Sequence, residues 1–212
     1  MTEIRTLRTE TTGRYLVERG PVPNAPLLVG FHGYGQNAET LLDDLRRIPG
    51  AEAWTLVSVQ ALHRFYSRSQ HVVASWMTSQ DREAAIADNL AYVARVVAEL
   101  RAETGATKLV FAGFSQGAAM AYRAAAHLKP CDGLIVLGGD LPKDVAELPN
   151  LVLPPVLIGR GEQDGIYTAE QLVKDVTALE VRGVQAEVCR FEGGHEWGKD
   201  LQKGIGCFLV GI

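Results

Sequence analysis

The chain has 212 residues and a formal net charge of −4 at pH 7, and 47% of its residues are hydrophobic, as in an ordinary globular domain. Acidic and basic residues are mixed along the sequence, which argues against a surface for nucleic acid or for an anionic membrane. No apolar run approaches the roughly 20 residues that span a bilayer, and the N-terminal stretch lacks the apolar core of a signal peptide. We therefore expect one domain, residues 1–212, in the cytoplasm and without membrane insertion.

The first half of the chain predicts three strands and two helices. The strands are expected at residues 15–18, 27–31 and 54–59, and the helices at 38–48 and 81–104. The longer helix is marked by a stripe of apolar residues at Ile86, Leu90, Val93, Val97 and Leu100. The intervening residues, 60 to 80, are expected to be irregular.

The second half continues the alternation of strand and helix. Strands are expected at residues 109–111, 134–137, 156–159 and 185–191, and helices after the first of these strands and at 167–181 and 199–209, with a proline-punctuated loop at 142–155. Such alternation predicts an α/β fold, a mostly parallel central sheet with helices on both faces. Functional residues in such sheets gather at the edge where the strands end.

The most informative stretch is residues 109–129, an apolar run followed by G-x-S-x-G and an alanine-rich helix. This arrangement is typical of a nucleophile elbow, a strained turn that lifts a serine hydroxyl off the backbone. Gly113 and Gly117 leave room for the neighbouring strand and helix to approach. Ser115 is therefore the predicted nucleophile, and the alternative is a serine in an ordinary strand-to-helix turn.

A serine nucleophile needs a histidine to accept its proton and a carboxylate to orient that histidine. In α/β-hydrolases the order along the chain is serine, acid, histidine. Of the five histidines, only His127 and His195 follow Ser115. His127 lies near the end of the elbow helix, so His195, in a GGHEW turn after a strand, is the predicted base; the alternative is a capping or surface histidine.

The acid is less constrained by the sequence. Asp164 follows the strand at 156–159 and precedes Gly165, which would allow a turn that aims the carboxylate inward. Asp140, in LGGDLP after the preceding strand, is a real alternative, and Glu162 lies nearby. We favour Asp164, for which the other interpretation is an Asx-turn residue.

Negative charge on a substrate carbonyl oxygen requires fixed N–H donors. The backbone N–H of Gln116, the residue after the nucleophile, is one predicted donor, and that of Tyr34 in the loop His32-Gly33-Tyr34-Gly35 is the other. His32 is expected to hold this loop, which could also be an ordinary glycine-rich turn. Metal-binding motifs and G-x-G-x-x-G are absent, so neither a metal nor a cofactor is expected.

Five motifs in this order, HGYGQN, SWM, GFSQG, GEQD and GGHEW, resemble the phospholipase/carboxylesterase family of α/β-hydrolases, which includes bacterial carboxylesterases and acyl-protein thioesterases. The resemblance covers the chain from about Pro26 onward. It implies an α/β-hydrolase fold without a large cap domain and a triad of Ser115, Asp164 and His195. It also places Tyr34 and Gln116 at the oxyanion-hole positions.

The resemblance further implies that Trp76 lies in the segment bordering the acyl pocket. We therefore predict substrate contacts for Trp76 and Met77, with a core-packing role as the equal alternative. In the loop HGYGQN, Tyr34 follows His-Gly where thioesterases of the family typically have an aliphatic residue, and Gln36 follows the second glycine where they typically have an aspartate. Residues 60 to 80 carry polar side chains unsuited to a channel for a long acyl chain: His63, Arg64, Arg68 and His71.

The sequence thus predicts a cytoplasmic serine carboxylesterase acting on a small-molecule ester. An acyl-thioesterase or lysophospholipase is the alternative within the same chemistry, and a non-catalytic ligand-binding protein is the alternative of another class. Neither nucleic acid nor a membrane is an expected partner, and a homodimer is left open. Three cysteines without metal-ligand spacing are interpreted as free thiols of a reducing compartment: Cys131, Cys189 and Cys207.

Overall fold

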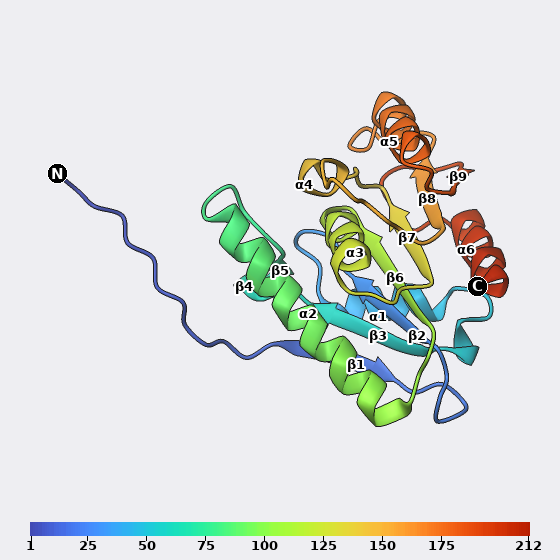
Figure 1. Cartoon of the computed structure of the whole chain (residues 1–212), viewed down its shortest axis with the longest axis horizontal. Helices are drawn as coiled ribbons and strands as arrows, with labels where there is room; N and C mark the ends of the chain where they lie inside the picture. The colour runs from blue at the N-terminus through green and yellow to red at the C-terminus, as the bar shows by residue number, and fades with distance from the viewer.

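A computed structural model describes residues 1–212, and its centre is a seven-stranded sheet (Figure 1). The strands of this sheet are β1 (Arg14–Glu18), β2 (Leu27–Phe31), β3 (Thr55–Gln60), β6 (Leu109–Phe114), β7 (Gly133–Leu137), β8 (Val156–Gly161) and β9 (Ala186–Phe191). They lie in the order β1-β3-β2-β6-β7-β8-β9. Only the β1–β3 pair is antiparallel, so the predicted mostly parallel α/β fold is confirmed.

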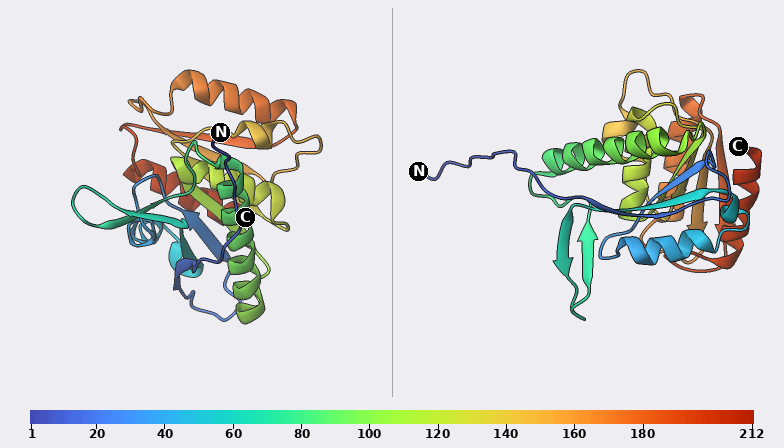
Figure 2. Two further views of the ribbon diagram at one scale, coloured as in Figure 1. Left: turned by 90° about the vertical axis from the view of Figure 1, so that its left-hand side faces the viewer. Right: turned by 90° about the horizontal axis from the view of Figure 1, so that it is seen from below.

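Helices cover both faces of the sheet, as Figure 2 shows from two further sides. The helices are α1 (Ala38–Arg46), α2 (Arg82–Thr104), α3 (Gln116–His127), α4 (Lys143–Ala146), α5 (Ala169–Val181) and α6 (Lys199–Gly211), with a short 3₁₀ turn, η1 (Ala51–Ala53). Helices α2, α3 and α5 pack against one face and α1 and α6 against the other. No helix is both long enough and apolar enough to span a membrane.

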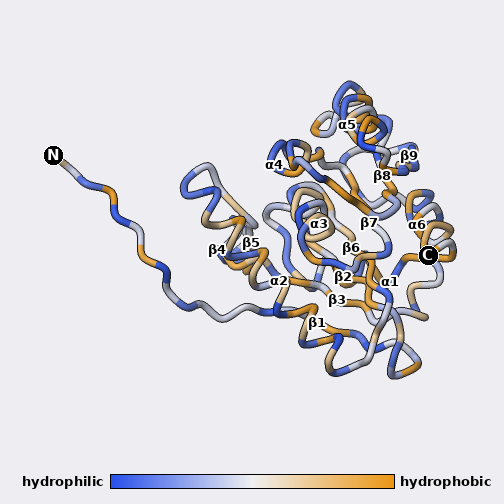
Figure 3. The backbone as a smooth tube through the Cα atoms, in the orientation of Figure 1, coloured by the Kyte–Doolittle hydropathy of each residue, from blue (hydrophilic) through white to orange (hydrophobic).

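The central strands consist mostly of apolar residues because both of their faces are covered. Every residue of β2, β3, β6, β7 and β8 is buried, and the hydrophobic residues in Figure 3 concentrate along these strands. Alternate side chains supply two cores. In β2, Val29 and Phe31 pack on the α2–α3 side, whereas Leu28 packs on the α1–α6 side.

Residues 60 to 80 differ from the predicted irregular segment. They contain a β-hairpin of β4 (His63–Tyr66) and β5 (Val72–Ser75) that projects from the body of the molecule (Figure 2). All of β4 is exposed, so it has no apolar face to produce the alternation by which a half-buried strand is recognised. A second difference is α4, a short helix within the expected loop at 142–155.

The parallel arrangement brings the ends of six strands to one edge of the sheet. The hairpin is attached to this edge, because Gln36 in the loop after β2 forms an antiparallel bridge with Ala74 of β5. The candidate functional residues follow strands β2, β6, β8 and β9, and the loop after β7 lies among them. This edge is therefore where the side chains singled out by the sequence can meet.

Candidate active site

Ser115 lies at the turn between β6 and α3 in a backbone conformation that few residues other than glycine adopt. Its φ is 54° and its ψ is −120°, a strained geometry of the kind that concentrates at functional sites. The Ser115 N–H donates to the Leu137 carbonyl oxygen at 2.8 Å, which ties the turn to β7. The Ser115 hydroxyl makes no capping hydrogen bond to α3, so it is not committed to the helix.

The two glycines of G-x-S-x-G are required by close backbone approach. A Cβ atom on Gly113 would lie 2.2 Å from the Gly117 carbonyl oxygen, and one on Gly117 would lie 2.0 Å from the carbonyl oxygen of Phe31. Neither position tolerates a side chain without movement of the main chain. The glycines therefore allow α3 to begin directly against β2 and β6, as expected for a nucleophile elbow.

His195 and Asp164 are joined by a hydrogen bond. The distance between His195 Nδ1 and Asp164 Oδ2 is 2.9 Å, and the Asp164 side chain is 1% exposed whereas that of His195 is 18% exposed. A buried carboxylate at Nδ1 leaves Nε2 of the same ring available to a reacting group. The structure thus brings together two of the three side chains that the sequence assigned to a triad.

The other carboxylate oxygen of Asp164 fixes its own loop. Asp164 Oδ1 accepts hydrogen bonds from the N–H groups of Ile166 (2.8 Å) and Tyr167 (2.9 Å). Asp164 therefore makes the hydrogen bonds of an Asx turn with one oxygen and contacts His195 with the other. Gly165 does not have a positive φ, so the turn depends on these hydrogen bonds and not on glycine flexibility. Asp140, the alternative acid, is exposed and makes no hydrogen bond to His195.

The environment of Asp164 keeps it ionised. Burial raises the pKa of this carboxyl, but the hydrogen bonds from His195, Tyr167 and Ile166 outweigh burial, so its pKa lies below its ordinary value. An anion is therefore present next to the His195 ring throughout the neutral range. Such an anion would stabilise an imidazolium formed on that ring during proton transfer.

Ser115 is connected to the His195–Asp164 pair by two consecutive glycines after β7. A Cβ atom on Gly138 would lie 3.0 Å from His195 Nδ1 and 3.3 Å from Asp164 Oδ2, whereas one on Gly139 would lie 2.5 Å from the Ser115 carbonyl oxygen. The ring of Phe114, the residue before Ser115, also lies near His195, with 4.9 Å between the ring centroids. Ser115 and His195 therefore each border the Gly138–Gly139 segment.

The Ser115 hydroxyl and the His195 ring are not hydrogen-bonded to each other in this structure; the hydrogen bond of His195 is the one to Asp164. In ligand-free enzymes the bond between nucleophile and base is often long and shortens when substrate binds. Ser115 and His195 thus both lie beside the Gly138–Gly139 segment but are not hydrogen-bonded to each other.

The two predicted oxyanion donors have uncommitted N–H groups. The N–H of Tyr34 donates to no backbone acceptor, while its neighbours do: Gly35 N–H bonds the Ala74 carbonyl at 3.0 Å and Gln36 N–H bonds that of Gly33 at 3.2 Å. Gln116 is the first residue of α3, a position whose N–H has no acceptor within the helix. A Cβ atom on Gly33 would lie 3.3 Å from Ser115 Cβ, so this loop borders the nucleophile.

His32 holds the same loop from beneath. Its Nδ1 lies 2.7 Å from the Gly33 carbonyl oxygen, and its Nε2 accepts the Ala61 N–H at 3.1 Å. This pattern requires a neutral ring with the proton on Nδ1. Burial lowers the pKa of His32 to about 4, against a smaller opposing effect of the Gly33 hydrogen bond. The structural role expected for His32 agrees with this arrangement.

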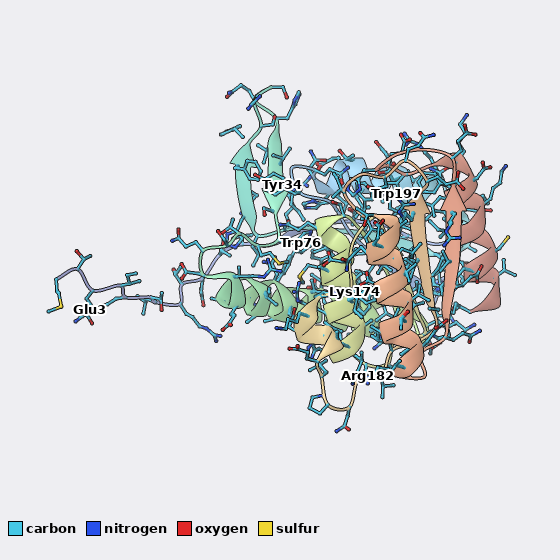
Figure 4. The ribbon with its side chains drawn as sticks, turned by 90° about the horizontal axis from the view of Figure 1, so that it is seen from above. Glu3, Tyr34, Trp76, Lys174, Arg182 and Trp197 are labelled. Carbon is cyan, nitrogen blue, oxygen red and sulfur yellow. The ribbon has the colours of Figure 1, made fainter.

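Trp76 and Met77 lie in the core. Trp76 is 0% exposed and Met77 is 3% exposed; the Trp76 indole N–H donates to the His32 carbonyl oxygen at 2.8 Å, and its ring packs edge-on against Phe31. Figure 4 shows Trp76 between the hairpin and α3, with Tyr34 beside the hairpin. These positions match the core-packing alternative. The predicted substrate contacts of Trp76 and Met77 are not supported, because neither side chain has exposed surface that a substrate could touch.

Sequence reasoning did not assign any role to the side chain of Gln116. Its Oε1 accepts the Trp76 N–H at 2.8 Å and the Ser75 hydroxyl at 3.2 Å, and its Nε2 donates to the Met77 carbonyl oxygen at 2.8 Å. This residue therefore joins the elbow to the base of the hairpin. The only signal in the sequence was its place in GFSQG, since the partners are some forty residues earlier.

Arg160 of β8 was also missed. Its side chain is buried, and it donates to the carbonyl oxygens of Tyr167 (2.7 Å) and Asp164 (3.1 Å). These hydrogen bonds hold the backbone of the loop that contains Asp164. No group of three or more His, Cys, Asp or Glu side chains is arranged so that it could hold a metal ion.

Comparisons with known proteins identify the family of the chain and its fold. The sequence model of the phospholipase/carboxylesterase family matches residues 13–172, most of the chain; the matched part contains Ser115 and Asp164 and ends before His195. No curated protein matches the sequence.

Solved structures with the same fold include three hydrolases. Esterase PE8 has a TM-score of 0.74 and 23% identity over 95% of this chain and 98% of that chain. A Bacillus cereus carboxylesterase has a TM-score of 0.74 and 16% identity over 94% of each chain. Zea mays acyl-protein thioesterase 2 has a TM-score of 0.74 and 20% identity over 94% of this chain and 99% of that chain. At these identities the likeness establishes the α/β-hydrolase fold.

Proposed function

This chain belongs to the phospholipase/carboxylesterase family of ester hydrolases, and we propose that it is a serine carboxylesterase acting on small carboxylic esters. The observation that carries the proposal is the buried Asp164–His195 hydrogen bond of 2.9 Å beside a serine held at a φ of 54°. A strained serine and an oriented imidazole at one edge of the sheet are the two components that nucleophilic ester hydrolysis requires.

In the proposed reaction, Ser115 Oγ attacks the ester carbonyl carbon while His195 Nε2 accepts the hydroxyl proton. The bond from that carbon to the alcohol oxygen breaks, and the imidazolium returns the proton to the leaving alcohol. A water molecule then attacks the acyl-enzyme, losing a proton to His195, and the Ser115 oxygen leaves and takes that proton back. Asp164 holds the imidazole in the required tautomer and stabilises its charged form.

The developing oxyanion would be stabilised by the backbone N–H groups of Tyr34 and Gln116. The Gln116 N–H lies at the N-terminus of α3, where the helix dipole favours negative charge. Each such donor is worth about 10²–10³ in rate in serine hydrolases. Because these donors belong to the backbone, side-chain substitution at either position leaves them in place.

A preference for small esters is supported by the surroundings of the elbow. The hairpin next to it exposes the whole of β4, in which His63 and Arg64 stand beside Phe65 and Tyr66. This mixed surface offers short apolar contacts and not the continuous apolar channel that a long alkyl chain needs. The Trp76 and Met77 side chains are packed in the core and do not offer a lined channel. We also propose the cytoplasm as the location, supported by the three unpaired cysteines.

The test is hydrolysis of acetyl, butyryl, octanoyl and lauroyl esters of p-nitrophenol, each paired with the corresponding thioester, with Ser115→Ala as the control. We expect kcat/KM to be highest for the acetyl and butyryl oxygen esters and to fall about tenfold or more for octanoyl, equivalent to about 1.4 kcal/mol of transition-state binding. A maximum at lauroyl thioester would replace the small-ester proposal by a thioesterase. Equal residual activity of wild type and Ser115→Ala would favour a non-catalytic binding protein.

A further inference from the structure

Asp175 is a buried carboxylate without a cationic partner. It lies on the inner side of α5 and is 2% exposed, and no lysine, arginine or histidine pairs with it. Its helix neighbours on the same side are Leu172 and Leu179, which belong to the apolar core. An ionisable group at such a position is costly to bury, and burial raises the pKa of Asp175. A leucine at this position would fill the same space without the cost of burying a carboxylate, so packing alone does not account for Asp175.

The hydrogen bonds of Asp175 reach two separate loops. Its Oδ2 accepts the Leu141 N–H at 3.0 Å and the Tyr167 hydroxyl at 2.9 Å, and its Oδ1 accepts the Gln171 side-chain amide at 3.0 Å. Leu141 belongs to the loop after β7, and Tyr167 to the loop after β8. One oxygen atom thus joins the two loops.

Both loops contact the proposed catalytic groups within a few residues of these anchors. Tyr167 donates its own N–H to Asp164 Oδ1 at 2.9 Å. Leu141 follows the Gly138–Gly139 segment, on which a Cβ atom at Gly138 would lie 3.0 Å from His195 Nδ1. A shift of either loop would therefore change the position of Asp164 relative to His195.

We propose that Asp175 is a positioning residue for the Asp164–His195 pair, because its carboxylate fixes the loops after β7 and β8 in a single arrangement. The inference rests on the proposed function, since it assigns Asp175 to the support of that site. Displacements of about 1 Å at a catalytic group can cost about 10² in rate. Loss of the Asp175 acceptor should therefore reduce kcat more than it changes KM.

The test compares Asp175→Ala, Asp175→Asn and Leu172→Ala. Asparagine keeps one acceptor oxygen for Leu141 and Tyr167, and the Gln171 amide can turn its carbonyl towards the new NH₂ group, so this variant should restore positioning. Leu172 is equally buried on the same helix but makes no side-chain hydrogen bond to either loop, so Leu172→Ala controls for destabilisation of α5. Each variant is measured by kcat and KM on p-nitrophenyl acetate, by thermal melting, and by the downfield proton resonance of the His195–Asp164 hydrogen bond.

We expect Asp175→Ala to lower kcat about 10- to 100-fold and to weaken or shift the downfield resonance. Asp175→Asn should stay within about threefold of wild type in kcat and keep the resonance. Leu172→Ala should lower the melting temperature without changing the resonance. The proposal is overturned if Asp175→Ala retains both kcat and the resonance, or if Leu172→Ala, still folded, reproduces its effects. An inactive wild type that still shows the resonance would reject the proposed function alone, because the resonance reports positioning without turnover.

Discussion

His195 Nδ1 lies 2.9 Å from Asp164 Oδ2, across 31 positions of sequence, and the second oxygen of the same carboxylate holds the backbone of its own loop. The hydrogen bonds to one oxygen thus fix the carboxylate whose other oxygen orients the histidine. This arrangement joins two strand ends, those of β8 and β9, which are neighbours in the sheet. Between Asp164 and His195 the chain forms helix α5 and strand β9.

The first prediction concerns the identity of the acid. Asp164→Asn keeps an acceptor oxygen for the Ile166 and Tyr167 N–H groups but presents an NH₂ group to His195, which favours the wrong imidazole tautomer. We expect kcat for p-nitrophenyl acetate to fall about 10⁴-fold while the protein stays folded. Asp140→Asn, at the exposed alternative position, should remain within about threefold of wild type. The opposite ranking of the two variants would assign the acid to Asp140.

The second prediction concerns the glycine that borders the pair. Gly138 has a φ of +58°, and a Cβ atom there would lie 3.0 Å from both Nδ1 and Cε1 of His195. Gly138→Ala should therefore displace the imidazole and lower kcat about 10- to 100-fold, and the left-handed backbone should cost about 1–2 kcal/mol in the free energy of unfolding. Kinetics and urea unfolding of the variant measure both effects.

Gly165→Ala is the matched control, because a Cβ atom at Gly165 meets nothing within 4 Å and its φ is not positive. It should change neither kcat nor stability appreciably, although it lies next to Asp164. If Gly138→Ala were as active as Gly165→Ala, the contact between the loop after β7 and His195 would have no catalytic importance.

The sheet could be predicted because its central strands consist mostly of apolar residues. Residues 27–31 are predicted and observed with the same bounds, and the elbow at Ser115 could be placed because strand, glycines and helix are all local features. The hairpin at 63–75 could not be predicted, since β4 has no buried side chain and β5 is held to the sheet edge by a bridge to the distant loop after β2.

The candidate site divides in the same way. The order of Ser115, Asp164 and His195 led to the expectation that Asp164 and His195 lie together, and the structure joins these two by a hydrogen bond. The roles of Ser115 and of the oxyanion loop stay predictions. The supporting contacts could not be predicted: the Gln116 side chain binds residues 75–77, and Asp175 binds Leu141 across 34 positions. Such contacts depend on how helices pack over the sheet, which no local pattern specifies. The burial of Trp76 depends on the same packing.

The third prediction concerns acid unfolding. Neutral His32 accepts the Ala61 N–H, and a proton on Nε2 would place two donors face to face. The pKa of His32 is lowered by burial to about 4 from 6.5, so between these values the unfolded chain binds a proton that the folded chain does not. The free energy of unfolding should therefore decrease as the pH falls from about 6.5 to about 4, with up to about 3 kcal/mol due to this group.

Urea unfolding at pH 7, 5 and 4 measures this contribution in wild type and in His32→Gln, which cannot take up the proton. The variant should be less stable at pH 7 but should lose less stability on acidification. His63→Gln, in the exposed strand β4, serves as the control and should follow the wild type. Parallel stability curves for His32→Gln and wild type would show that His32 does not stay neutral in the folded protein.

The central claim, that Ser115 is an activated nucleophile, is tested most directly by reaction of the folded protein with a fluorophosphonate probe, followed by mass spectrometry of the labelled peptide. We expect stoichiometric labelling of wild type at Ser115, none in Ser115→Ala, and labelling slowed by orders of magnitude in His195→Ala, because the base is then missing. Folded wild-type protein that remains unlabelled at Ser115, or that is labelled equally fast without His195, would contradict the account.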